Sequence, residues 1–129
     1  MGQINFKLYI MPTTLRSTTH TAKKEHHCDY CLQKISIGEE YGYAAMVYCG
    51  DFYTWKNHIK CEWIAHQLNM FDEAYEGVND EMFCEEITNE YSNLMDKHFN
   101  VICESKNYEV PNFKDQLDFV IKFHSDRDQ

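Results

Sequence analysis

Three cysteines and one histidine stand at spacings that suit a metal ion. Cys28 and Cys31 form a C-x2-C pair, and an H-x2-C pair, His58 and Cys61, follows after 26 residues. Zinc prefers four such ligands in a tetrahedron, and two intervening residues let a tight turn or one helical turn direct both side chains at one ion. The sequence therefore predicts one structural Zn²⁺ held by Cys28, Cys31, His58 and Cys61.

The elements around the two pairs are expected to bring them together. No helical period surrounds the first pair, so it should lie in a turn. Strand-forming residues at 40–49 and 51–56 predict a β-hairpin, with Gly50 first in a two-residue loop of type II′. Asn57 is expected to cap a helix that opens at His58. The inward face of this helix carries Cys61, Ile64, Ala65 and Leu68. A turn, a hairpin and a helix in this order form the arrangement called a treble clef.

Regular structure is also predicted on both sides of this unit. Alternating apolar residues at 3–10 indicate an N-terminal strand, and residues 13–21 suggest a loop or an edge strand. A helix is expected over 80–99, capped by Asn79 or Asp80. A short strand at 101–111 and a helix at 113–124, capped by Asn112, complete the pattern.

The fold class that follows is α+β. A single domain is expected over residues 1–129, because this length suits one compact core. Within it, residues 26–72 would form the treble-clef zinc module and residues 79–129 an acidic helical extension.

Charge is unevenly distributed along the chain. The formal net charge is −9, of which residues 1–34 contribute +3, residues 35–68 contribute −2 and residues 69–129 contribute −10. Nucleic-acid affinity depends on cations that contact phosphates, so this balance disfavours nucleic acid as a partner. A basic protein, or one that itself binds nucleic acid, fits better.

The chain shows neither an apolar run of membrane-spanning length nor a secretory signal, so no membrane association and a cytoplasmic location are expected. In a reducing compartment disulfides are rare. The three cysteines outside the proposed site, Cys49, Cys84 and Cys103, are therefore expected to be small buried hydrophobic residues.

The stretch from Cys28 to Trp63 resembles the zinc fingers of poly(ADP-ribose) polymerases and DNA ligase III. It shares a C-x2-C followed by an isoleucine and a turn, a strand pair, an H-x2-C, and an aromatic residue two places after the last ligand. The resemblance covers about 36 of the 129 residues. The interval between the two ligand pairs is slightly shorter in this chain than in those fingers. It implies the same four ligands and a packing role for Trp63. The chain also resembles small treble-clef proteins of bacteria, phages and mobile elements.

Two alternatives concern the metal site. His26 or His27 would replace a ligand or lie just outside the ligand set, although exposed polar residues before a turn are more common. A zinc hydrolase would need an open coordination position and an acid such as Glu62 nearby. Because four ligands close the site and no catalytic motif is present, no catalytic residue and no enzymatic activity are predicted.

Function is therefore expected to be binding. The leading hypothesis is a protein-interaction module, in the sharpest form a phage or mobile-element inhibitor that engages a nucleic-acid-binding host protein. Its partner-binding residues would be Glu81, Glu85, Glu86 and Glu90, although acids near a helix N-terminus also have a local explanation. The alternative is a nucleic-acid-binding finger with a basic footprint of Lys7, Arg16, Lys23 and Lys24. The sheet aromatics Tyr41, Tyr43, Tyr48, Phe52, Tyr53 and Trp55 would then stack on bases, whereas packing the sheet is their expected role.

Overall fold

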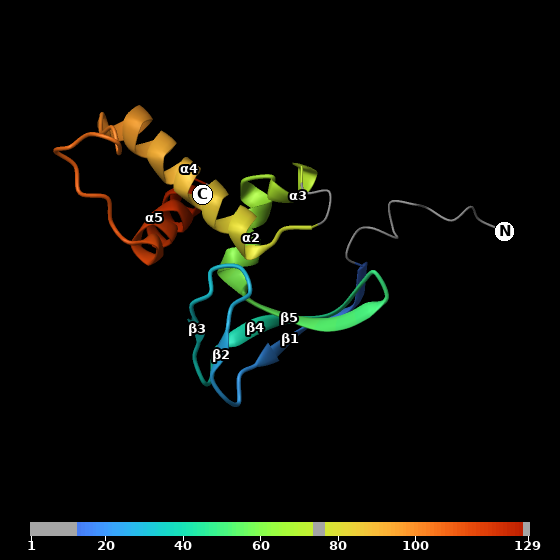
Figure 1. The fold of residues 1–129 in the computed structure, drawn as a ribbon. Helices are drawn as coiled ribbons and strands as arrows, with labels where there is room; N and C mark the ends of the chain where they lie inside the picture. The colour runs from blue at the N-terminus through green and yellow to red at the C-terminus, as the bar shows by residue number, and fades with distance from the viewer. Residues whose placement is uncertain (1–12, 74–76, 128–129) are drawn as a thin grey trace.

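The computed structural model describes residues 13–73 and 77–127. All strands in these residues precede the helices, which gives a mixed fold of helices and small antiparallel sheets (Figure 1). The strands are β1 (Thr13–Thr21), β2 (His26–His27), β3 (Lys34–Ile35), β4 (Glu40–Tyr48) and β5 (Asp51–His58). The helices are α2 (Ile59–Gln67), α3 (Met70–Glu73), α4 (Asp80–Phe99) and α5 (Phe113–Arg127).

The larger sheet has three antiparallel strands in the order β1-β4-β5, so β1 is an edge strand. The predicted hairpin is confirmed, but its predicted turn is wrong. The loop is Cys49–Gly50, with φ of 53° and 85°, and Asp51 already pairs with Tyr48. Positive φ at both loop positions is the pattern of a type I′ turn, which matches the twist of the strands better than the type II′ turn expected from Gly50 alone.

The smaller sheet consists of β2 and β3, which pair on either side of the C-x2-C turn. The Leu32 N–H donates to the Cys28 carbonyl at 2.8 Å, and the Cys28 N–H donates to the Gln33 carbonyl at 2.9 Å. Leu32 has a positive φ of 63°, which lets the chain reverse within so few residues. The prediction that the first ligand pair lies in a turn is confirmed.

Helix α2 begins where β5 ends, but not with the predicted cap. His58 occupies the N-cap position and makes no side-chain cap hydrogen bond. The Asn57 side chain is buried, and its Nδ2 donates to the His58 carbonyl at 2.8 Å. Asn57 therefore braces the junction from within the sheet. The predicted inward face is confirmed for Cys61, Ile64 and Ala65, which are all buried.

The two longer helices begin at predicted caps. Asn79 Oδ1 accepts a hydrogen bond from the Met82 N–H at 2.8 Å, and Asn112 Oδ1 accepts one from the Asp115 N–H at 2.9 Å. Such bonds satisfy backbone donors that have no partner within the helix. Helix α4 has the predicted bounds, whereas α5 continues past residue 124 to Arg127.

The segment between α4 and α5 contains turns and no strand, so the predicted strand at 101–111 is wrong. The Ser105 N–H donates to the Ile102 carbonyl, and the Tyr108 N–H donates to the Ser105 carbonyl. The Tyr108 hydroxyl also bonds the Tyr91 hydroxyl on α4. The segment is therefore held by local turns and by this contact, and not by the backbone hydrogen bonds that a strand would make with a neighbouring strand.

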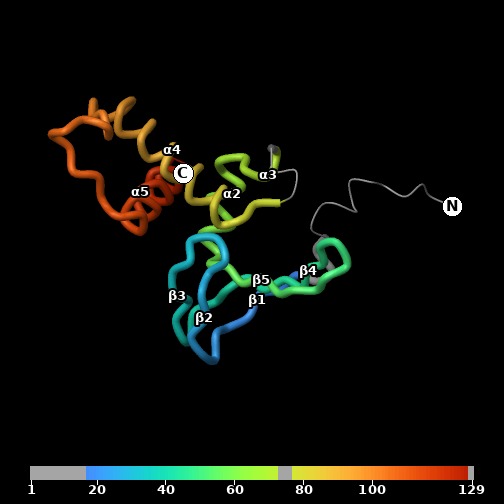
Figure 2. The backbone as a smooth tube through the Cα atoms, viewed as in Figure 1, coloured from blue at the N-terminus to red at the C-terminus, as the bar shows by residue number. Residues whose placement is uncertain are grey.

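Buried side chains from both sheets and from α2, α4 and α5 form one cluster. The Tyr30 ring joins the parts, with ring centroids 4.9 Å from Trp55 on β5 and 5.2 Å from Phe83 on α4. Figures 1 and 2 show the helices on one side of the three-stranded sheet. Within the described residues no helix has the length and apolar character needed to cross a membrane. The strand predicted at 3–10 lies outside those residues.

Candidate metal centre

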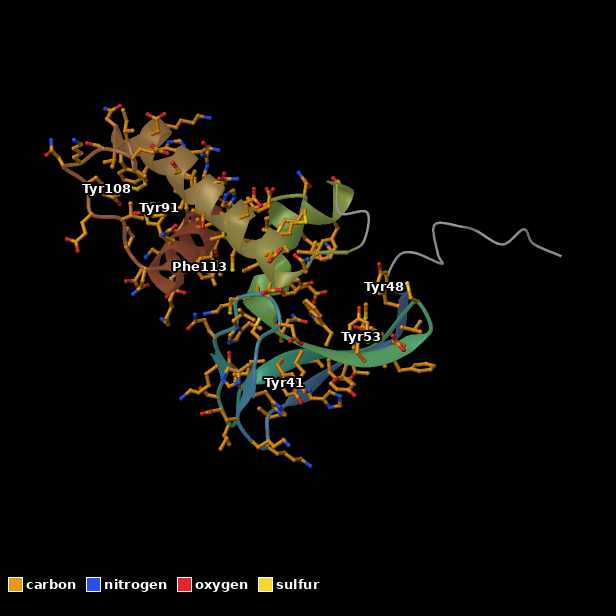
Figure 3. The ribbon with its side chains drawn as sticks, in the orientation of Figure 1. Tyr41, Tyr48, Tyr53, Tyr91, Tyr108 and Phe113 are labelled. Carbon is orange, nitrogen blue, oxygen red and sulfur yellow. The ribbon has the colours of Figure 1, made fainter. Side chains whose placement is uncertain are left out.

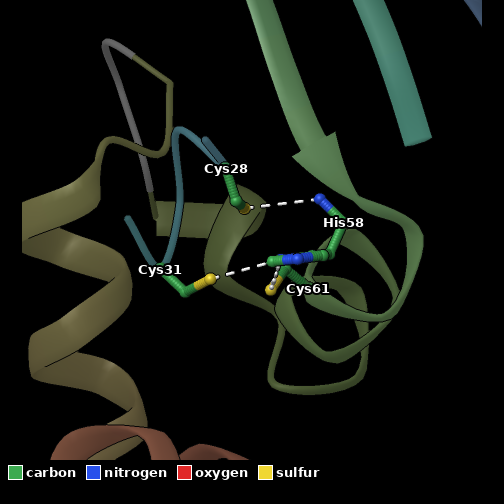
Figure 4. Close-up of side chains that lie close together, drawn as sticks. All are labelled: Cys28, Cys31, His58 and Cys61. Carbon is green, nitrogen blue, oxygen red and sulfur yellow. Dashed lines mark hydrogen bonds between the residues drawn. The ribbon is translucent and has the colours of Figure 1, made fainter. Parts of the chain in front are cut away.

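The four predicted ligands come together from three elements. Cys28 and Cys31 project from the turn between β2 and β3, His58 ends β5, and Cys61 lies in the first turn of α2 (Figure 4). Their ligand atoms all lie within 4.8 Å of one another. All four residues are between 0% and 5% exposed. This quartet of three sulfurs and one imidazole could hold one metal ion.

The distances within the quartet fit a tetrahedral ion. The His58 Nδ1 atom lies 3.3 Å from Cys31 Sγ and 3.7 Å from Cys61 Sγ. Bond lengths of ~2.3 Å to sulfur and ~2.1 Å to nitrogen place two such ligands about 3.6 Å apart in a tetrahedron. Without gross rearrangement, the side chains can therefore surround an ion.

The His58 ring is oriented by a contact outside the quartet. Its Nε2 lies 2.9 Å from the Lys34 carbonyl oxygen. A carbonyl only accepts, so Nε2 carries a proton, and Nδ1 is the ring nitrogen that faces the sulfurs. Outer contacts of this kind fix the tautomer and orientation of metal-binding histidines. Glu39 Oε2 is 3.9 Å from the same Nε2 and adds a weaker attraction.

Backbone N–H groups support the Cys28 sulfur. The N–H groups of Tyr30 and His58 donate to Cys28 Sγ at 3.4 and 3.3 Å. Side-chain hydrogen bonds from Cys31 and Cys61 lower the pKa of the Cys28 thiol, and the hydrogen bond to Cys28 raises the pKa of Cys61. Hydrogen bonds to the Cys28 and Cys31 sulfurs raise the pKa of His58 to about 10. Without a metal the quartet therefore holds protons that an incoming cation must displace.

A pair of hydrogen bonds attaches the C-x2-C turn to β5. The Asp29 N–H donates to the Lys56 carbonyl at 2.7 Å, and the Lys56 N–H donates to Asp29 Oδ2 at 2.8 Å. Burial raises the pKa of the Asp29 carboxyl. Sequence reasoning did not identify this contact, although aspartate side chains in turns commonly accept hydrogen bonds from backbone N–H groups.

Other candidate residues lie outside the quartet. The His26 ring contacts Tyr41 in a tilted arrangement with ring centroids 5.1 Å apart, and both His27 and Glu62 are exposed. Trp63 packs against the buried core, in agreement with the resemblance. Within residues 13–73 and 77–127, no second group of three or more such side chains could hold a metal ion.

The three remaining cysteines are not buried as predicted. Cys49 is exposed because it occupies the hairpin turn, and Cys84 and Cys103 are half-buried. The alternative basic footprint is only partly described: Lys23 and Lys24 are exposed, whereas Lys7 lies outside the described residues.

The four predicted partner-binding glutamates lie in two different environments on α4. Glu81 and Glu85 are exposed and Glu86 is half-buried. Glu90 forms an ion pair with His124 of α5, and both side chains are largely covered, with 22% and 24% exposed. Glu90 therefore joins the two helices, and the exposed acids lie nearer the start of α4.

Comparison of the chain with protein-family models, with curated proteins and with solved structures finds no match.

Proposed function

We propose that the protein is a structural zinc module of the treble-clef type. The observation that carries this proposal is the buried quartet, with its imidazole turned so that Nδ1 faces the sulfurs. Three thiolates and one imidazole favour zinc over calcium or magnesium, which prefer oxygen ligands. Four protein ligands also leave no position for a reactive water, which supports a structural role over that of a hydrolase.

The treble-clef assignment rests on the order and placement of the elements. The β2–β3 turn supplies Cys28 and Cys31, the β4–β5 hairpin follows, and the junction of β5 with α2 supplies His58 and Cys61. Zinc would then fasten the turn to the start of the helix.

Metal content is the first test. Elemental analysis of purified protein should find one zinc per chain, and Cys61→Ser should lose it together with several kcal/mol of the ~10 to 16 kcal/mol that structural zinc contributes in finger peptides. Cys84→Ser, at a half-buried cysteine outside the quartet, is the matched control and should retain the metal. A wild-type protein without stoichiometric metal would contradict the proposal.

The module is further proposed to act by binding a basic protein partner. Residues 69–129 carry a net charge of −10, and Glu81 and Glu85 present part of it to solvent on α4. Complementary charge raises association rates and suppresses wrong partners. The more specific role of phage or mobile-element inhibitor stays a prediction.

A pull-down tests this partner class. Glu81→Lys combined with Glu85→Lys should lose the captured basic proteins, because the reversed charges repel them. Glu104→Lys combined with Glu109→Lys changes the net charge equally in the exposed segment before α5 and should retain them. An identical set of captured proteins for both double variants would contradict an acidic α4 interface.

Nucleic-acid binding is the second candidate, and one surface favours it. On the sheet face turned away from the helices, the Lys56 ammonium lies 5.8 Å from the Tyr43 ring centroid, and Phe52 is 78% exposed. Labelled DNA and RNA should then bind in a salt-dependent manner that Lys56→Glu weakens and Lys106→Glu does not. Without salt-dependent binding this candidate is removed.

A further inference from the structure

A groove of about 720 Å³ lies between the helix-facing side of the three-stranded sheet and helices α2 and α3. Strand pairing sets the residues on this face: Ala44 pairs with Trp55, and Met46 pairs with Tyr53. Tyr48 and Tyr53 lie toward the hairpin end of the sheet (Figure 3). On the helix side, the wall includes Ile59 and Phe71.

Aromatic and aliphatic side chains dominate the wall of this groove, and several of them reach solvent. Tyr53 and Phe71 are each 37% exposed, and Ile59 is 45% exposed. The Trp55 ring meets Tyr30 edge-on with centroids 4.9 Å apart, so this part of the wall is held in place by the core. Aromatic rings present negative potential on their faces, which attracts cations.

Charge in the groove has one sign. Among the described residues of its wall, Glu62 is the only charged side chain. The Glu62 side chain lines the groove together with Tyr30 and Trp55, so a carboxylate belongs to the same wall as the aromatic rings. The groove also reaches Asn79, the cap of α4, where the acids Asp80 and Glu81 follow. The start of α4, which carries these two acids, therefore lies next to the groove.

We propose that this groove binds an extended segment of a partner protein through its lysine or arginine side chains. The aliphatic stems would lie along Tyr53, Trp55 and Ile59, and the cationic heads would reach the Glu62 carboxylate. The inference rests on the proposed function, because it gives the basic partner of the acidic α4 surface a site of contact. A nucleic-acid occupant fits less well, since no described lysine or arginine in the wall would meet a phosphate.

Fluorescence anisotropy with a short labelled peptide of alternating lysine and alanine tests the proposal on the metal-loaded full chain. Tyr53→Ala and Glu62→Gln should each weaken binding by about 3- to 10-fold, the range of a partly exposed cation–π contact or ion pair. Phe52→Ala is the matched control for Tyr53, because Phe52 is adjacent but points to the opposite face of the sheet. Glu109→Gln is the matched control for Glu62, and both controls should bind as the wild type does.

The groove and the α4 surface give different results in this assay. If only Glu81→Lys combined with Glu85→Lys weakens peptide binding, the groove is not the site and the inference is overturned, while the proposed function stands. If the wild type binds no peptide, the inference is again overturned. The proposed function fails with it only if the pull-down is also unaffected by charge reversal.

Other occupants would also overturn the inference. Tighter binding of single-stranded DNA than of the basic peptide would assign the groove to nucleic acid. Tighter binding of a synthetic peptide of residues 1–12 would assign it to the chain's own amino terminus. A dimer in sedimentation that Tyr53→Ala dissociates would assign it to a second copy.

Discussion

Asn57 is a buried residue that contacts the backbone of the predicted ligand His58. It is 5% exposed, and its Nδ2 donates to the His58 carbonyl at 2.8 Å. The same amide lies over Gly42, the residue that pairs with Asn57 across β4 and β5. A Cβ atom on Gly42 would come within 2.9 Å of Asn57 Oδ1. The absence of a side chain at Gly42 therefore gives Asn57 the room it needs next to the metal quartet.

Gly42→Ala is accordingly predicted to lower the free energy of unfolding by about 1 to 3 kcal/mol, the usual range for a group forced into a packed site. It should also weaken metal binding, because the displaced Asn57 no longer braces the His58 backbone. Thermal unfolding and competition with a chromophoric chelator measure the two effects.

A double variant identifies the cause. With Asn57→Ala in place the clash is gone, so adding Gly42→Ala should then cause little further loss, and the two changes should be non-additive. Full additivity would mean that Gly42 is required for a reason other than its contact with Asn57.

At this scale, the roles of residue types with strong ligand or capping preferences were predictable from the sequence. Cysteine and histidine at two-residue intervals identified the quartet, and Asn79 and Asn112 identified helix starts. Asn57 has the same capping preference, yet it is still part of β5, which runs directly into α2. Its side chain therefore bonds the His58 carbonyl and does not cap the helix. The contact between His58 and the Lys34 carbonyl was not predictable, since a backbone carbonyl is the same in every residue.

At the scale of elements, Asp29 joins the C-x2-C turn to β5 through its backbone N–H and its carboxylate. The turn is short, and β2 and β3 have two residues each. Two paired residues per strand hold the turn only weakly. The contact with Lys56 is therefore needed to keep Cys28 and Cys31 facing the other two ligands.

Asp29→Ala should lower the free energy of unfolding by about 1 to 3 kcal/mol, because the part-buried Lys56 N–H loses its acceptor. It should also weaken metal binding by about 10-fold or more. Asp29→Asn keeps an acceptor oxygen and should retain most of the stability and most of the metal affinity. Asp51→Ala, at an exposed aspartate on β5, the strand that contains Lys56, should change neither. Chemical denaturation and chelator competition provide the measurements, and equal behaviour of Asp29→Ala and Asp51→Ala would contradict the role assigned to Asp29.

The ion pair of Glu90 and His124 is the corresponding link between α4 and α5. Glu90→Gln should lower the free energy of unfolding by about 1 kcal/mol, because both side chains are largely covered and a part-buried pair exceeds the small contribution of a surface pair. Glu85→Gln, on the exposed side of the same helix, is the control. Urea denaturation that does not distinguish the two variants would show that the pair contributes no stability.

Hairpin and helices were predictable at this scale because periodicity and caps are local signals. The segment from 100 to 112 was not, because strand-forming residues become a strand only beside a partner strand, and none is adjacent among the described elements. The turn at Cys49–Gly50 shows the same limit. Its type is set by the register of β4 on β5, and one residue of register changes which positions need a positive φ.

For the molecule as a whole, the metal quartet and the acidic helices share one core. Tyr30 lies in the sequence between Cys28 and Cys31, and its ring contacts Phe83 of α4. Phe83 and Ile87 on α4 belong to the same buried cluster as Cys28 and Cys61. A change in the C-x2-C turn therefore reaches the packing of α4 directly.

Metal removal is predicted to unfold the helices together with the proposed zinc module. Structural zinc contributes ~10 to 16 kcal/mol in finger peptides, which is as large as the whole ~5 to 15 kcal/mol stability of a typical domain. Loss of the ion frees the turn that holds Tyr30, and Phe83 then loses its partner in the core. Far-UV circular dichroism, which reports mainly α4 and α5, and the fluorescence of Trp55 and Trp63 should fall together on addition of a strong chelator. Two separate transitions would instead divide the chain into independent units at 26–72 and 79–129, because coincident probes are the mark of one cooperative unit.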